Sequence, residues 1–258
     1  SGVVAIENIT KESKVLTHEG KYESVYHTQV RPYSGKLFTL TITGQPSEKI
    51  EATEEHPFLT VKRKRKNERN TTWKTEWLPV KELQKGDYVC TPIDKTRVVQ
   101  ETMTYEVPVG NGRHGWQLEK LTFPCNEDLF KLIGYYLAEG SISSGSYLNF
   151  SFNVSEREYI QEVQALLFSV FGETKISESQ HEKNHGTNVV VSSVRLCRFF
   201  EQFGTHSNDK RIPTWVMQED EKKQAALIEC WYAGDGNYYS KNLKHGFKEM
   251  FRISTVSQ

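Results

Sequence analysis

Two stretches of the chain share one pattern of apolar and small residues, and each predicts a helix. Residues 132–140 read LIGYYLAEG and residues 228–236 read IECWYAGDG, so both end with an acid followed by a glycine. In both stretches two small residues stand four positions apart: Gly134 with Ala138, and Cys230 with Gly234. This spacing puts them on one face of a helix, where a second backbone can come very close.

The acids at the ends of these stretches, Glu139 and Asp235, need an explanation beyond stability. A glycine just past a helix end is ordinary. An acid in the last turn faces the negative end of the helix dipole, which is electrostatically unfavourable. Binding of a divalent cation would account for both acids. Two unrelated buried helices with glycine caps would explain either stretch alone.

The segments that follow the two stretches also resemble each other, which indicates an internal repeat. Residues 150–155 read FSFNVS and residues 251–257 read FRISTVS. Self-similarity of this kind favours two related halves over two unrelated helices.

The first part of the chain predicts a compact all-β domain over residues 1–95. Short β-branched or aromatic runs alternate with turn residues there. We expect strands at residues 3–6, 14–17, 22–30, 37–43, 49–52 and 58–62. Residues 77–89 predict a short helical turn, a Lys-Gly-Asp turn and a further strand. Residues 96–124 contain scattered proline and glycine and are expected to form an irregular junction.

Residues 125–258 predict an α+β domain. A helix starts after the N-cap Asn126, with acids in its first turn. A hairpin follows, and Ser155 with Glu158 forms a capping box for a second helix that ends near Gly172. A strand at 188–193 and a helix at 194–203 complete one half, and after an acidic capping region the second long helix follows.

Charge and cysteine usage limit the class of protein. Lys plus Arg and Asp plus Glu both total 33, so a nucleic-acid surface would have to come from local clustering. The dense basic cluster is Lys62, Arg63, Lys64, Arg65 and Lys66, which is read equally well as a solvated hairpin tip or as a DNA-backbone contact. Four cysteines without metal-ligand spacing, no apolar run near ~18 residues and no signal-peptide pattern predict an intracellular protein without a membrane span.

Three motifs in the first third of the chain together resemble the self-splicing Hint domain of inteins. They are Tyr33-x-Gly35, Thr53-x-x-His56-Pro57 and Leu83-x-x-Gly86-Asp87-x-Val89. In that family the Thr and His polarise the amino-terminal scissile peptide and promote its acyl shift, and the resemblance gives these roles to Thr53 and His56. A histidine exchanges protons near neutral pH, and a hydroxyl can donate to a developing oxyanion.

The chain departs from the intein pattern at both ends. The family opens with a Cys or Ser nucleophile about a dozen residues ahead of a strand that resembles residues 2–9, and this opening is missing, so Ser1 is not expected to be the nucleophile. The closing His-Asn followed by Cys, Ser or Thr is missing too. The chain is therefore expected to be an internal piece of a longer intein that does not splice alone, with host-protein exteins as its partners in the precursor.

The second part of the chain, residues 120–258, resembles the LAGLIDADG homing endonucleases. The similarity rests on both nine-residue stretches and on Lys210-x-Ile212-Pro213. It implies paired helices between two pseudo-symmetric halves of a monomer, each half laying a sheet into the major groove of double-stranded DNA. It also implies Glu139 and Asp235 as Mg²⁺ ligands and Lys210 in the chemistry, the alternative for Lys210 being a plain surface lysine.

The physical chemistry agrees with those implied roles. Two carboxylates that share hard cations can activate water and neutralise a leaving oxygen, and an ammonium can stabilise transition-state charge. Cys230 replaces the glycine usual at the helix interface, but it is small enough to pack there. Few residues follow Gly236, so the second half is expected to be incomplete.

The expected fold is therefore an all-β Hint-type domain followed by an α+β LAGLIDADG endonuclease domain with two pseudo-symmetric halves, the second incomplete. The leading hypothesis is an intein fragment that combines protein splicing with site-specific cleavage of double-stranded DNA at an intein-less allele. One alternative is a regulator or maturase-like protein that binds DNA or RNA without cleaving it. Another is an autoprocessing Hint domain with a decayed endonuclease.

Overall fold

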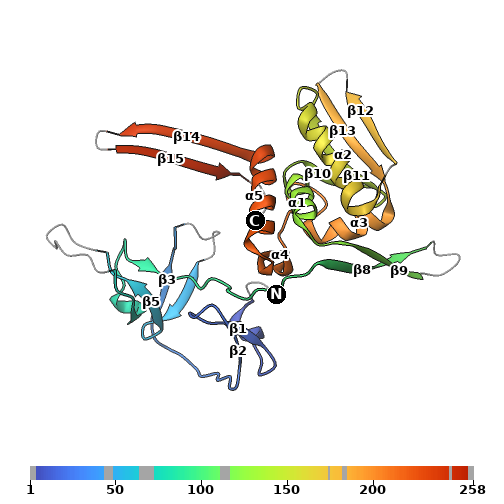
Figure 1. Cartoon of the computed structure of the whole chain (residues 1–258). Coiled ribbons are helices and arrows are strands. Elements are labelled where there is room, and N and C mark those ends of the chain that lie inside the picture. The colour runs from blue at the N-terminus through green and yellow to red at the C-terminus, as the bar shows by residue number, and fades with distance from the viewer. Residues whose placement is uncertain are drawn as a thin grey trace. The chain divides into compact units, whose positions relative to one another are not determined.

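The chain forms two compact units, Ser1–Thr96 and Arg97–Gln258 (Figure 1). The computed structural model describes residues 4–43, 49–63, 73–110, 117–173, 175–181, 185–243 and 246–254. Each unit is described by itself below.

The first unit consists of short antiparallel strands in three small sheets. The pairs are β1 (Lys14–Leu16) with β2 (Tyr22–Ser24), β3 (Leu37–Leu40) with β4 (Ile50–Thr53), and a sheet in the order β6 (Glu76–Pro79), β5 (Pro57–Val61), β7 (Tyr88–Val89). Two 3-10 turns, Ile6–Asn8 and Val80–Glu82, accompany them. The all-β prediction thus agrees with the described residues, but residues 6–8 form a 3-10 turn where the end of a strand was expected.

Among the described residues of the first unit, few side chains are buried. They are Ala52, Thr60, Leu78 and Val80. Large apolar side chains such as Tyr26, Val30 and Trp77 are exposed instead. Because burial of apolar surface is the main stabilising contribution to folding, these strands have little core of their own in the described part of the chain.

The segment predicted to be an irregular junction, residues 96–124, instead contains a β-hairpin that belongs to the second unit. Strands β8 (Thr102–Val109) and β9 (Gln117–Pro124) pair in antiparallel register. Met103 and Phe123 are buried in the core of that unit, and the Phe123 ring lies 4.9 Å from the rings of Phe171 and Phe199. The prediction was wrong because Pro108 was taken as a strand breaker, although an edge strand tolerates proline.

A four-stranded antiparallel sheet forms the centre of the second unit. Its order is β10 (Gly140–Ser143), β11 (Tyr147–Asn153), β13 (Gly186–Ser192) and β12 (Ile176–His181). Residues of β11 and β13 alternate between buried and more exposed positions, as expected for a sheet covered on one face. Strand β12 was not predicted, because its residues are mostly polar and follow no apolar alternation.

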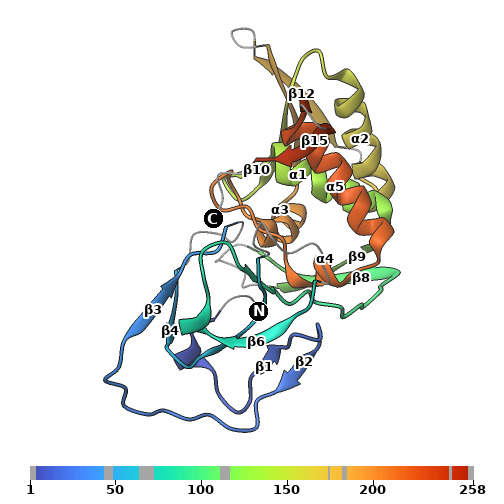
Figure 2. The same cartoon turned by 90° about the vertical axis from the view of Figure 1, so that its left-hand side faces the viewer.

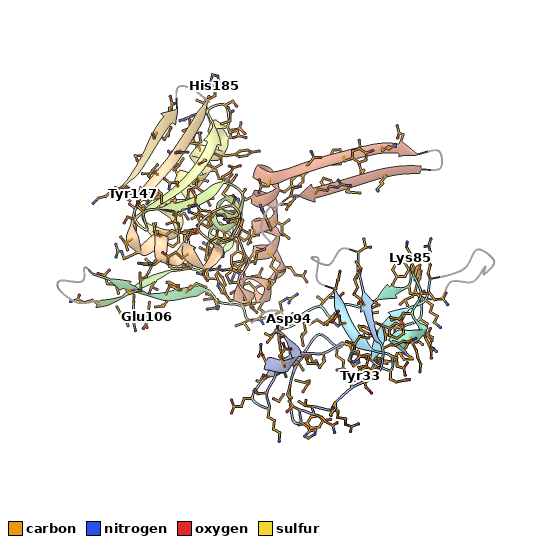
Figure 3. All side chains as sticks on the ribbon, turned by 180° about the vertical axis from the view of Figure 1, so that it is seen from behind. Tyr33, Lys85, Asp94, Glu106, Tyr147 and His185 are labelled. Carbon is orange, nitrogen blue, oxygen red and sulfur yellow. The ribbon has the colours of Figure 1, made fainter. Side chains whose placement is uncertain are left out.

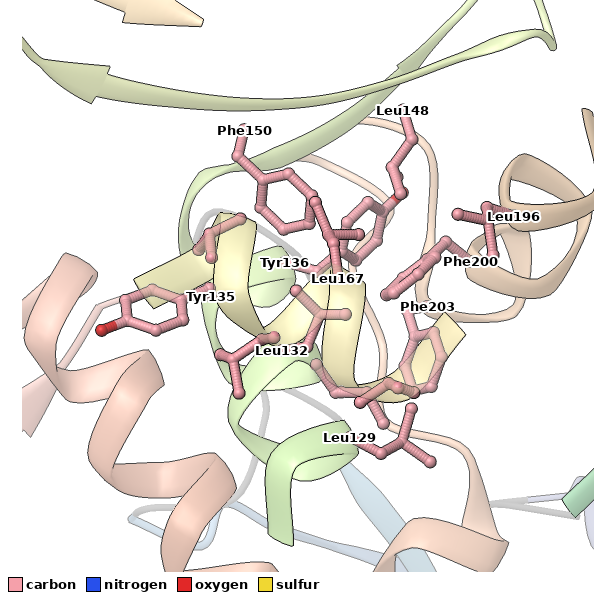
Figure 4. Packing of buried hydrophobic residues seen from close by; sticks show 14 of the residues in the cluster. Leu129, Leu132, Tyr135, Tyr136, Leu148, Phe150, Leu167, Leu196, Phe200 and Phe203 are labelled. Carbon is pink, nitrogen blue, oxygen red and sulfur yellow. The ribbon is translucent and has the colours of Figure 1, made fainter. Parts of the chain in front are cut away.

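Helices α1 (Glu127–Glu139), α2 (Arg157–Phe171) and α3 (Val194–Phe200) cover the buried face of the sheet (Figure 2). Aromatic and aliphatic side chains from all these elements meet there, with Tyr136 among Phe150, Phe200 and Phe203 (Figure 4). The Tyr136 hydroxyl donates a hydrogen bond of 2.5 Å to the carbonyl of Gly204, so its one polar group is satisfied inside this core.

Helix starts follow the predicted capping chemistry in two cases out of three. The Asn126 side chain accepts from the Leu129 N–H at the start of α1, as predicted. Asp220 accepts from the N–H groups of Lys222 and Lys223 at the start of α5 (Glu221–Asp235). The predicted capping box of Ser155 and Glu158 is wrong, because α2 begins one residue later and the Ser155 hydroxyl donates to Asn153 instead.

A short 3-10 turn, Glu201–Phe203, and helix α4 (Thr214–Gln218) lead to α5, which packs along α1. A hairpin of β14 (Gly236–Leu243) and β15 (Gly246–Ile253) follows directly from α5. We call this hairpin the arm. In the part of the chain that the structure describes, no helix is long and apolar enough to cross a membrane.

Candidate active site at the ends of two paired helices

Small residues let α1 and α5 come into close contact. The position where a Cβ would stand on Gly134 is 3.0 Å from the Cβ of Cys230. The corresponding position on Gly234 is 2.6 Å from the Cβ of Ala138. The predicted small-residue face is therefore confirmed, and Cys230 is buried within it.

The two helices end in the same way. The N–H of Gly140 donates to the carbonyl of Tyr136 at the end of α1, and the N–H of Gly236 donates to the carbonyl of Tyr232 at the end of α5. The acid that precedes each glycine is the last helical residue. Glu139 Oε1 is 3.2 Å from the absent Cβ of Gly234, which is the residue next to Asp235. The structure thus brings the two predicted acids to one place.

Burial and like charge make this place unfavourable for two bare carboxylates. Burial raises the pKa of Glu139 to about 7, and the negative charges of Asp235 and Glu156 act in the same direction. Burial also raises the pKa of Asp235, while the Trp231 indole and the Lys210 ammonium oppose that rise. A site that desolvates two neighbouring acids is suited to hold a cation.

Lys210 is buried beside the acids, with 8% of its surface exposed, so the alternative of a plain surface lysine is wrong. Its Nζ donates to the carbonyls of Tyr136 and Gly140, both at 2.7 Å, and lies 3.5 Å from the centroid of the Tyr136 ring. Burial lowers the pKa of Lys210 to about 7, while Asp209 and Asp235 act in the opposite direction. The ammonium therefore also caps the carboxyl end of α1.

Tyr136 is a residue of the candidate site that the sequence did not reveal. Its ring and its carbonyl oxygen both contact the Lys210 ammonium. The only available signal was the repetition of a tyrosine three residues before each acid, at Tyr136 and Tyr232. That pattern is also typical of a helix core, so it could not indicate a lysine partner.

The donor set suits a hard divalent cation such as Mg²⁺. In the described ranges, no group of three or more His, Cys, Asp and Glu side chains is placed to hold a metal. Mg²⁺ is usually bound by only one or two carboxylates, with water and substrate phosphates as its other ligands. Glu139 and Asp235 fit that role, and the ion would lower the pKa of bound water and neutralise charge on a leaving oxygen.

The residues predicted for splicing, Thr53 and His56, lie at the two ends of one tight turn in the first unit. The His56 N–H donates to the Thr53 carbonyl at 2.9 Å, and Thr53 is partly buried at the end of β4. The exposed His56 ring packs edge-on against Phe58. Their splicing roles remain a prediction.

Only part of the predicted basic cluster lies within the described residues. Lys62 and Arg63 are exposed just after β5, and the Arg63 N–H donates to Asp87 at 3.0 Å. Lys64, Arg65 and Lys66 lie outside the described residues, so a DNA contact by this cluster also remains a prediction.

Comparison with known proteins identifies a LAGLIDADG-like domain at residues 127–204. Over 92% of its length the chain is 27% identical to an iron-sulfur cluster assembly SufBD family protein of Mycobacterium tuberculosis, of which it covers 27%. It is 27% identical over its whole length to the ATP-dependent DNA helicase Hel308 of Thermococcus kodakarensis, of which it covers 25%. It is also 29% identical, over 42% of its length, to 6% of the DNA polymerase II large subunit of that organism. The chain thus spans about a quarter of the two relatives that it matches almost throughout.

Proposed function

We propose that the second unit is a divalent-metal-dependent endonuclease that cleaves both strands of duplex DNA. The observation that carries the proposal is the pairing of Glu139 with Asp235 at the ends of two closely packed helices, where burial raises the pKa of both acids. The LAGLIDADG-like domain at residues 127–204 supports a nuclease, since it includes α1 and the sheet that continues from it.

The paired arrangement suits cleavage of two strands. Duplex DNA has approximate two-fold symmetry, and α1 and α5 present one acid each from equivalent positions. Each acid can then hold a cation against one scissile phosphate, where carboxylates orient the attacking water. The Lys210 ammonium lies beside the acids and would stabilise negative charge that develops on the phosphate.

The test uses a duplex in which the genomic sequences on either side of the coding segment are joined directly. The purified chain with Mg²⁺ is expected to linearise a plasmid that carries this junction, and EDTA should abolish the cleavage. Glu139→Gln and Asp235→Asn should each reduce cleavage at least 100-fold while duplex binding persists. Binding without cleavage by the parent protein would instead support the regulator or maturase-like alternative.

A second candidate function, protein splicing, concerns the first unit together with flanking sequence. This candidate starts from one observation: segments 27% identical to almost the whole chain lie within an iron-sulfur cluster assembly SufBD family protein and an ATP-dependent DNA helicase. Insertion of one element into unrelated host genes would produce such a distribution. The host protein's flanking segments would then be the exteins.

Splicing is tested in the full-length precursor. Ligated flanks and a released insert should appear on a gel, and Thr53→Ala or His56→Ala should slow their formation. Glu139→Ala with Asp235→Ala should leave splicing unchanged, because these acids lie in the second unit. Splicing without cleavage by the parent protein would support an autoprocessing protein with a decayed endonuclease.

A further inference from the structure

Helix α5 is buried along one side only. Its buried side chains are Lys223, Ala226, Leu227 and Cys230, and their spacing places them on one face of the helix. Figure 3 shows α5 from behind with its side chains drawn, some of which point away from α1. The position of α5 along α1 therefore depends on the contacts of a single stripe of residues.

The small residues of this stripe do not fix that position by themselves. Gly134 of α1 faces Cys230, and Ala138 faces Gly234. Another small residue, Ala226, lies one helical turn before Cys230. If α5 moved along α1 by four residues, Gly134 would face Ala226 and Ala138 would face Cys230. Small residues would again meet small residues, so close packing is compatible with either position.

Such a shift would separate the two acids of the candidate site. Four residues correspond to about 6 Å along a helix, and Asp235 would move by this distance relative to Glu139. Two metal ions that act together on one phosphodiester lie only about 3.5–4 Å apart. The position of α5 along α1 thus decides whether the acids form one site.

A buried ion pair lies at the opposite end of the two helices. Glu219 is fully buried just before α5, and its carboxylate is 2.8 Å from Nζ of Lys223, which also lies 3.7 Å from Asp220. Both members of the pair bind the backbone of Gln100. Its N–H donates to Glu219 at 3.1 Å, and its carbonyl accepts from Lys223 at 2.6 Å. We call Gln100, Glu219 and Lys223 the clasp.

The clasp is joined to the start of α1 through Cys125. This buried residue directly precedes the N-cap of α1, and its N–H donates to the carbonyl of Glu101 at 2.8 Å. Its thiol donates to the carboxylate of Glu219 at 3.6 Å. The clasp therefore connects the beginning of α5 to the beginning of α1. It lies about 18 Å along α5 from Asp235.

Movement of α5 along α1 would break the clasp. The N–H and the carbonyl of Gln100 would lose their charged partners inside the protein, where hydrogen bonds to charged groups are strong and unpaired polar groups are costly. A buried ion pair is weak evidence for stability, and its best attested use is to fix the register of packed helices. The clasp thus distinguishes between two positions that the small residues allow.

We propose that the clasp sets the position of α5 along α1 and thereby holds Asp235 level with Glu139. This inference rests on the proposed function, because it concerns the ion that the two acids hold. Glu219 and Lys223 are then positioning residues that act through α5. An apolar pair of similar volume would preserve the fold but not the alignment of the acids.

The test measures binding of Tb³⁺ to the full chain without DNA, read as luminescence sensitised by Trp231, whose indole interacts with Asp235. The double variant Glu219→Leu with Lys223→Met removes both charges of the clasp and should stay folded. Its affinity for Tb³⁺ is expected to fall about ten-fold or more, as for lost support of a metal ligand. Glu139→Gln should weaken binding similarly in the parent but change little in the double variant, because the acids there no longer share one ion.

Two controls separate alignment from general damage. Lys223→Arg keeps a cation that can bind Glu219 and the carbonyl of Gln100, and the cavity of about 750 Å³ that Lys223 lines has room for the larger side chain. Cys125→Ala removes the thiol and keeps the clasp. Both variants should bind Tb³⁺ as the parent does. Plasmid cleavage gives a second readout, in which the double variant should accumulate nicked rather than linear product.

A folded double variant that binds Tb³⁺ as tightly as the parent would overturn the inference even if the parent cleaves DNA. A parent whose luminescence does not respond to Glu139→Gln would overturn it as well. Loss of Tb³⁺ affinity in the double variant of a protein that never cleaves DNA would support the clasp and defeat the proposed nuclease. Circular dichroism melting identifies a double variant that fails to fold. Glu219→Gln, measured below its melting temperature, then takes its place with the same expected loss.

Discussion

The ammonium of Lys210 lies over the ring of Tyr136 and donates to the carbonyl oxygen of the same residue, at 3.5 Å from the ring centroid and 2.7 Å from the oxygen. Tyr136 is buried three positions before Glu139 in α1. The lysine is thus attached to the end of the helix that carries one of the acids. The position of the ammonium therefore depends on how that helix ends.

Replacement of Lys210 by Met should destabilise the protein by about 1–3 kcal/mol near pH 6.5, because the carbonyls of Tyr136 and Gly140 lose the hydrogen bonds of the ammonium. The folded-state pKa of about 7 lies below the unfolded value near 10.5, so the unfolded chain binds more protons between these values. Lys210 should therefore contribute a rise in stability with pH in that window, on the order of 3 kcal/mol, seen as the difference between the parent and the Met variant. Urea denaturation at pH 6.5 and 9.5 measures it.

The Lys210→Met variant should lack this rise in stability, and Lys222→Met serves as the control. Lys222 is exposed, so its replacement should preserve the rise. A stability difference between the parent and Lys210→Met that stays constant from pH 6.5 to 9.5 would contradict the burial of Lys210 described above.

Glu139→Gln should stabilise the metal-free protein at pH 8 and have little effect at pH 4.5. The folded-state pKa of Glu139 is raised to about 7, so the folded chain binds more protons than the unfolded chain between about 4.5 and 7. Stability of the parent therefore falls as pH rises through that window, and the variant avoids about 1–3 kcal/mol of this loss.

Added Mg²⁺ should reverse the ranking of the two proteins at pH 8. A ligand that binds only the folded state stabilises it by RT ln(1 + [L]/Kd), so the effect grows with ligand concentration relative to Kd. The melting temperature of the parent should rise with Mg²⁺, and that of Glu139→Gln should rise less. Equal shifts in both proteins would exclude Glu139 as a ligand.

Gly134→Ala should destabilise the protein by about 1–3 kcal/mol, although alanine has the higher helix propensity. The new methyl group would meet the backbone of α5 at Leu227 and the side chain of Cys230. Overpacking of this kind usually destabilises a protein by more than the ~1 kcal/mol of stability that alanine adds over glycine through its higher helix propensity. Cys230→Ala, which removes Sγ but keeps the Cβ that faces Gly134, should cost less than Gly134→Ala in thermal melts. The opposite order would show that the helices can separate freely.

Glu219→Gln should be strongly destabilising, by about 3–5 kcal/mol. Glu219 is fully buried, and its carboxylate lies 2.8 Å from Nζ of Lys223, which is 7% exposed. Glu219 also accepts from the N–H of Gln100, and Lys223 donates to the carbonyl of the same residue. Removal of the Glu219 charge leaves the buried Lys223 with only the more distant carboxylate of Asp220, 3.7 Å away.

The double variant Glu219→Leu with Lys223→Met should recover much of that loss, because no unpaired charge remains. Urea titration of the two single variants and the double variant gives the coupling energy. Losses that simply add would contradict a direct ion pair.

The sequence was sufficient to predict those features that are encoded within a few neighbouring residues, such as helix contacts and helix caps. The small residues Gly134 and Gly234 predicted the close helix contact, and the Asn126 cap predicted where α1 begins. Each of these depends on the geometry of a single helix, which the sequence encodes directly. The hairpin at residues 102–124 and strand β12 were missed, because their strand character depends on neighbours elsewhere in the chain.

By itself, the sequence determined that two apolar helices with small faces would end in the acids Glu139 and Asp235, because periodicity and spacing are properties of the chain alone. Only the tertiary structure decided that Lys210 is buried against Tyr136 and that three cations of the arm share one face, namely Lys241, Lys248 and Arg252. The burial of Lys210 depends on a contact with a residue far away in the chain, and the shared face of the cations depends on the register of β14 and β15. Charge and pKa at the site follow from those long-range contacts, since desolvation and Coulomb interactions depend on distance in space.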